Sequence, residues 1–143
     1  MSTVDIDRLI EQNHRMLGEF IRGNLEPAKK FFSHGEDVTL ANPFFPVACG
    51  WKNVLRTLER AISNFKDGEL VGFEPVAKHV TPDLAYTVEV ERFKAKVGGG
   101  KDLSPVAIRV TSIFRPEEGV WKLVHRHADP IISPQPAESV IEG

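Results

Sequence analysis

The hydrophobic periodicity of this sequence changes once, near residue 68, and that change constrains the fold more than any other feature. Before it, apolar residues recur every three or four positions, which is the spacing of an amphipathic helix. Acidic residues at the start of the first segment and glycines after the segments mark helix ends. The pattern predicts three helices, over residues 4–22, about 24–35 and 51–65.

After residue 68, β-branched and aromatic residues come in runs that turn-forming residues separate. These runs predict strands over about 70–80, 84–97, 103–115 and 120–128. Their short connections indicate an antiparallel meander, and one further short strand is expected at 38–41. Helices followed by strands are typical of an α+β domain whose helices cover one face of a sheet.

The composition indicates one folded domain and excludes several classes of partner. The 143 residues are 41% hydrophobic and 27% charged, as in an ordinary globular protein. A formal charge of -2 is too balanced for a nucleic-acid-binding surface. The sequence has no apolar run long enough to cross a bilayer and no signal-peptide pattern at its N-terminus. We therefore expect a cytoplasmic protein that binds neither nucleic acid nor membrane.

The C-terminal part carries a family resemblance. The strand Arg109–Arg115, the turn 116–119 and the strand Trp121–Pro130 resemble the last two strands of SnoaL-like domains, which belong to the nuclear transport factor 2-like superfamily with ketosteroid isomerase. The order of elements over residues 4–130, including the break at Asn42-Pro43-Phe44, is similar too.

The resemblance implies three N-terminal helices packed on a strongly curved antiparallel sheet, a cone-shaped half-barrel of the cystatin-like type. It implies a SnoaL-like domain over residues 1–130, and the remaining segment, 131–143, is a proline-containing tail. The superfamily includes isomerases, dehydratases, cyclases, epoxide hydrolases and non-catalytic assembly domains, and it often forms dimers through the outer sheet face. The sequence has a single tyrosine, Tyr86, and does not match the Tyr and Asp pair of ketosteroid isomerases, so steroid isomerisation has little support.

Two histidines near the end of the last strand are candidates for chemistry. Successive side chains of a strand point to opposite faces, so strict alternation places His125 and His127 on one face and Arg126 on the other. Asp129 can orient the ring of His127 and make it a useful acid or base. His125 and His127 with Asp129 also have a spacing compatible with metal ligation, but further ligands are missing, and we expect no metal. In the alternative interpretation, one histidine packs in the sheet and the other lines a cavity.

A second candidate is a cross-strand pair of Glu91 and Arg109. Arg109 can donate two hydrogen bonds to a carboxylate or enolate ligand while Glu91 holds its side chain in position. The alternative is an ion pair that only satisfies two charges at the sheet surface. The sequence thus nominates four catalytic residues: His127, Asp129, Arg109 and Glu91.

Aromatic and polar residues near the entrance to the third helix are candidates for the wall of a pocket. They are Asn42, Phe44 and Trp51, to which we add Tyr86 and His125. The leading hypothesis is a small-molecule-binding protein, with isomerase, cyclase or hydro-lyase activity through cofactor-independent acid–base catalysis in an apolar pocket. The alternative is a non-catalytic ligand-binding or oligomerisation module. The expected partners are a small apolar or carboxylate-bearing ligand and a second copy of the chain, with no cofactor.

Overall fold

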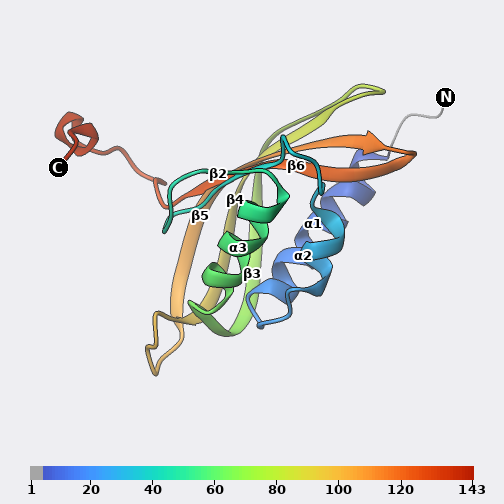
Figure 1. The fold of residues 1–143 in the computed structure, drawn as a ribbon. Coiled ribbons are helices and arrows are strands. Elements are labelled where there is room, and N and C mark those ends of the chain that lie inside the picture. Colours follow the sequence, from blue (N-terminus) through green and yellow to red (C-terminus); the bar gives the residue numbers. More distant parts are fainter. Residues whose placement is uncertain (1–4) are drawn as a thin grey trace.

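In the structure, a computed structural model that describes residues 5–143, three helices pack on one face of a curved six-stranded sheet (Figure 1). The predicted α+β half-barrel is confirmed. The helices are α1 (Ile6–Phe20), α2 (Glu26–Phe31) and α3 (Trp51–Ile62), and a short 3-10 helix, η1 (Ala137–Val140), follows the sheet. The strands are β1 (Thr39–Ala41), β2 (Ala48–Cys49), β3 (Phe65–Val80), β4 (Ala85–Val97), β5 (Ser104–Glu117) and β6 (Val120–Asp129).

The strand order in the sheet is β2-β1-β6-β5-β4-β3. The predicted antiparallel meander is present from β3 to β6. The sheet is nevertheless mixed, because β1 pairs in parallel with β6 through Thr39 and His125. The prediction of a wholly antiparallel sheet is therefore wrong at this edge. Most of the chain separates β1 from β6, so no turn between them could reveal their relative direction.

The third helix ends earlier than predicted, and β3 begins at Phe65. Asp67 and Gly68, which the sequence places at the helix end, instead lie in the first of three irregularities of β3. Such bulges bend a strand and increase its twist. Gly68 also donates its backbone N–H to the carbonyl of Ile21 over 3.1 Å. A Cβ on Gly68 would lie 2.5 Å from Ile21, so the close contact between β3 and the end of α1 needs a glycine.

Alternation along β4 places every second side chain on the concave face. Buried and more exposed positions alternate from Ala85 to Ala95, and the buried set includes Glu89 and Glu91 as well as Phe93. The apolar faces of the helices pack over this surface, with Leu9 and Met16 of α1 in the main core. The concave face therefore forms the interior of the domain and carries two carboxylates.

Alternation is interrupted in β6. The register shifts between Ile113 and Phe114 of β5, whose partners are His125 and Leu123, so Val124 is the extra residue of a bulge. As a result, Leu123 and Arg126 are both buried on the concave face. Strict alternation would have placed Leu123 on the same face as His125 and His127, and it fails here because of this bulge.

After Asp129 the chain leaves the sheet, and its last residues extend away from the body of the domain (Figure 1). The boundary between a domain and a tail at residue 130 stays a prediction. Among the helices of residues 5–143, none has the length and apolar character needed to span a membrane.

Candidate functional site

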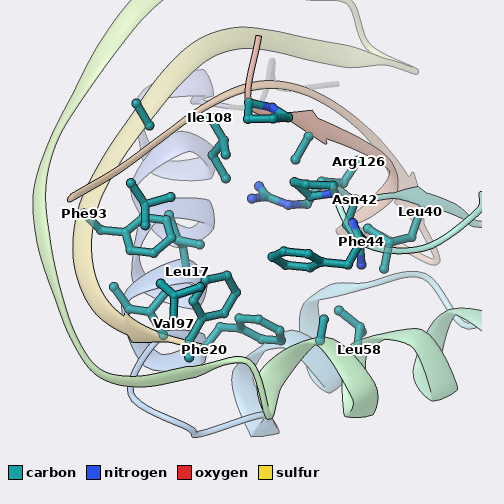
Figure 2. Close-up of a pocket in the computed structure, with 18 of the residues that line it drawn as sticks. Leu17, Phe20, Leu40, Asn42, Phe44, Leu58, Phe93, Val97, Ile108 and Arg126 are labelled. Carbon is teal, nitrogen blue, oxygen red and sulfur yellow. Dashed lines mark hydrogen bonds between the residues drawn. The ribbon is translucent and has the colours of Figure 1, made fainter. Parts of the chain in front are cut away.

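A cavity of about 470 Å³ lies between the helices and the concave face of the sheet. Its apolar wall comes from several elements, and Figure 2 shows among them Leu17 and Phe20 of α1, Leu58 of α3, Phe93 of β4 and Ile108 of β5. The curvature of the sheet separates these side chains enough to leave space between them. The cavity is thus a mostly apolar chamber whose shape follows from the bent strands.

Two polar side chains interrupt the apolar lining within residues 5–143. They are Asn42, which follows β1, and Arg126 of β6. Figure 2 shows the guanidinium of Arg126 extending from β6 into the cavity. The bulge at Val124 explains this direction, because without it Arg126 would face outward.

Arg126 is held from behind by Glu91 of β4. Its Nη1 donates to Oε2 of Glu91 over 3.0 Å, and its Nη2 donates to Oε1 over 2.8 Å. Arg126 is only 8% exposed and Glu91 is fully buried. This two-point geometry fixes the plane of the guanidinium and is the strongest form of an arginine–carboxylate contact.

The charges around Arg126 keep it ionised. Burial of the guanidinium lowers its pKa, but the charge and hydrogen bonds of Glu91, with the charge of Glu89, outweigh burial and raise the pKa of Arg126. The group is therefore a permanent cation and a fixed hydrogen-bond donor at the cavity wall.

A second contact to a buried carboxylate lies beside the first. Glu89 is two residues before Glu91 on the same face of β4. Nε2 of His14, from α1, lies 2.9 Å from Oε1 and 2.8 Å from Oε2 of Glu89, within hydrogen-bonding distance of both. The ring of His14 stacks on Phe73 of β3, with ring centroids 3.4 Å apart. This pair fastens α1 to the sheet.

Asn42 and Phe44 lie at the cavity as the sequence predicts. The side-chain oxygen of Asn42 accepts hydrogen bonds from the N–H groups of Phe44 and Phe45, at 2.9 and 3.0 Å, which shapes the turn after β1. The NH₂ of Asn42 is then the part of this side chain that can donate to a ligand. Phe44 is 44% exposed and packs against Phe65, so it forms part of the cavity wall near the solvent.

The other predicted pocket residues are not part of this lining. Trp51 stacks on His34, with ring centroids 4.1 Å apart. Tyr86 is on the outer face near His79. His125 shares a 2.7 Å hydrogen bond with Thr39 of β1. Burial, together with the charge of His127, lowers the pKa of His125.

Three of the four predicted catalytic residues form a cluster on the outer side of the sheet. Asp129 accepts a hydrogen bond from Nε of Arg109 at 2.7 Å and lies 3.2 Å from Nε2 of His127. The side chains of Arg109 and His127 are 57% and 52% exposed. The predicted Glu91–Arg109 pair is therefore wrong, because the two residues lie on opposite faces and each has another partner.

Asp129 is tightly held in this outer cluster. Partial burial raises the pKa of Asp129, but hydrogen bonds from Arg109, the backbone of Ile131 and His127, with the charge of Arg109, outweigh it and lower the pKa overall. Among the described residues, no three His, Cys, Asp or Glu side chains form a group that could hold a metal ion.

Sequence reasoning missed Arg126 and His14, the partners of the two buried carboxylates. The sequence did contain a signal that the two carboxylates are buried. Glu89 and Glu91 alternate with outward residues on a face that also carries Ala85 and Phe93, so both acids needed cationic partners inside. The bulge that turns Arg126 inward has no such signal.

A family model for the SnoaL-like domain matches residues 9–133. The chain belongs to the SnoaL-like domain family. This SnoaL-like domain is also similar to solved structures across the nuclear transport factor 2-like superfamily. A comparison with curated proteins finds no match.

Three of the similar structures illustrate the range of names within this fold. A Salmonella enterica protein of the nuclear transport factor 2-like superfamily is 17% identical, with a TM-score of 0.77 over 92% of this chain and 94% of that chain. A candidate dehydratase of the nuclear transport factor 2-like family from Streptomyces avermitilis is 23% identical, with a TM-score of 0.75 over 90% of this chain and 97% of that chain. A ketosteroid isomerase-like protein from Erwinia carotovora is 16% identical, with a TM-score of 0.69 over 87% of this chain and 93% of that chain. At these identities the likeness establishes the fold, and the activity must be argued from the cavity.

Proposed function

We propose that this SnoaL-like domain binds a small, mainly apolar molecule in its cavity and holds one polar atom of that molecule at Arg126. The observation that carries the proposal is a guanidinium fixed by Glu91 at the wall of an otherwise apolar chamber. A cavity of about 470 Å³ is within the usual range for small-molecule sites.

The lining supports recognition more directly than catalysis. Arg126 and Asn42 can donate hydrogen bonds, whereas acid–base catalysis also needs a group that accepts a proton. Both oxygens of Glu91 already accept from Arg126, and His127 with Asp129 lies outside the lining. Of the hypotheses drawn from the sequence, ligand binding is therefore the one we carry forward, and isomerase, cyclase or hydro-lyase activity is not needed to explain the site.

Native mass spectrometry of the purified protein tests the proposal, with denaturation and extraction to identify any retained compound. We expect that an apolar molecule, either retained from purification or added, raises the melting temperature of the protein. The variant Ala128→Leu places a larger side chain in the cavity wall and should reduce that rise. As a matched control, the outer pair Arg109→Met with Asp129→Asn should leave it unchanged. An empty protein whose melting temperature responds to no apolar compound would refute the proposal.

We also propose that two copies associate through the outer face of the sheet and that the protein acts in the cytoplasm. The helices lie on the concave face, so the outer face of β4 and β5 has no helix over it among the described residues (Figure 1). Val88 and Val90 of β4 and Ile113 of β5 are on this face and are partly exposed. Cell fractionation tests the location, and sedimentation of the wild type beside a variant of the outer face tests the association.

A further inference from the structure

The charges around the cavity constrain the class of ligand more narrowly than the shape of the cavity does. Of the lining residues within 5–143, Arg126 alone carries a formal charge. Its positive charge is already opposed by Glu91, which contacts it at two points. A ligand that reaches Arg126 therefore meets a neutralised cation.

A second carboxylate adds to this effect. Glu89 lies on the same face of β4 as Glu91, and its charge acts on Arg126. Its partner, His14, contributes a positive charge only when the imidazole is protonated. The buried group of Glu89, Glu91, Arg126 and His14 is thus neutral with a protonated His14 and negative with a neutral one.

Arg126 nevertheless keeps hydrogen-bonding capacity. A guanidinium has more N–H groups than one carboxylate accepts, so N–H donors remain for a ligand. An incoming carboxylate would lose its hydration and would lie near the carboxylates of Glu89 and Glu91, of which Glu91 already contacts the guanidinium at two points. A ketone, ester or amide oxygen accepts the same hydrogen bonds and loses much less hydration energy.

We infer that the cavity selects uncharged ligands with a carbonyl-type acceptor, and discriminates against carboxylates of the same length and shape. The inference rests on the proposed function and names its ligand class. Of the two ligand types expected from the sequence, it retains the apolar one and rejects the carboxylate-bearing one.

Isothermal titration of the intact protein with two nearly isosteric probes, 2-undecanone and decanoate, tests this selectivity at neutral pH. The probes differ in a methyl group where decanoate has a charged oxygen. We expect the ketone to bind at least about tenfold more tightly. Equal or tighter binding of decanoate would overturn the inference and leave the proposed function standing. If neither probe binds and no apolar compound is retained, the proposed function fails and the inference falls with it.

A variant identifies the cause of the selectivity. Glu91→Gln keeps the size and an amide oxygen for Arg126 but removes the opposing charge, so the affinity for decanoate should rise relative to the affinity for the ketone. Glu89→Gln, which keeps the Arg126–Glu91 contact, should shift the preference in the same direction by a smaller factor and covers the case in which Glu91→Gln does not fold. If every folded variant keeps the ketone preference, charge does not cause the selectivity and the inference is wrong.

Discussion

Arg126 of β6 reaches across β5 to Glu91 of β4, and the two residues form a two-point ion pair in the interior of the domain. The pair joins strands that are not neighbours in the sheet, and it also supplies the charged group of the cavity wall. One contact therefore contributes to both the packing of the sheet and the proposed binding site. Variants of the pair must be tested for stability and ligand binding separately.

Removing one partner of this pair should be costly. Glu91→Leu leaves the Arg126 charge buried without its counter-ion, and we expect a loss of about 3–5 kcal/mol in the free energy of unfolding. Arg126→Met together with Glu91→Leu should recover much of that loss and still abolish polar recognition in the cavity. Arg109→Met, which removes the more exposed Arg109–Asp129 pair, is the matched control and should change the free energy of unfolding by no more than about 1 kcal/mol. Urea unfolding measures all three, and a double variant as unstable as Glu91→Leu would contradict this account.

Two glycines of β3 provide a test of the contact between the sheet and α1. Gly68→Ala would place a Cβ 2.5 Å from Ile21, whereas Gly72→Ala meets no atom within 4 Å. We expect Gly68→Ala to lower the free energy of unfolding by about 1–3 kcal/mol because β3 must move away from α1. Gly72→Ala should be nearly neutral in the same denaturation experiment. Similar effects of the two substitutions would show that the close approach at Gly68 does not matter for stability.

His125 should make stability depend on pH in the mildly acidic range. Burial lowers its pKa in the folded protein below the ordinary value of 6.5, so the unfolded chain binds a proton first as the pH falls. The free energy of unfolding should therefore decrease below about pH 6.5 and level off, for this group, once the folded protein is also protonated. Unfolding of the wild type and His125→Gln between about pH 7.5 and pH 5 isolates this contribution. An identical pH dependence of the two proteins would exclude it.

The sequence predicted the fold better than the site, and β6 shows why. Periodicity and turn residues depend on local chain chemistry, so the helices and the β3–β6 meander could be recognised. The bulge at Val124 depends on how β6 pairs with β5, and a one-residue shift turns every later side chain to the other face. Alternation separated Arg126 from His125 and His127, as the structure does, but the hypothesis of a pocket role for His127 assigned the inner face to the histidines, whereas Arg126 is the residue that lies inside. The parallel pairing of β1 with β6 escaped detection for the same reason, since both depend on contacts between distant segments.

Association through the outer sheet face makes a final testable prediction. Val88 is partly exposed on this face, opposite Thr111 of β5, and a lysine there would place a charge in the proposed interface. We expect the wild type to sediment as a dimer at micromolar concentration and Val88→Lys to sediment as a monomer with an unchanged circular dichroism spectrum. Val120→Lys is the matched control, because Val120 is 55% exposed at the far end of the β5–β6 hairpin and its substitution should leave the dimer intact. A monomeric wild type, or a Val88→Lys variant that remains dimeric, would show that this face is not the interface.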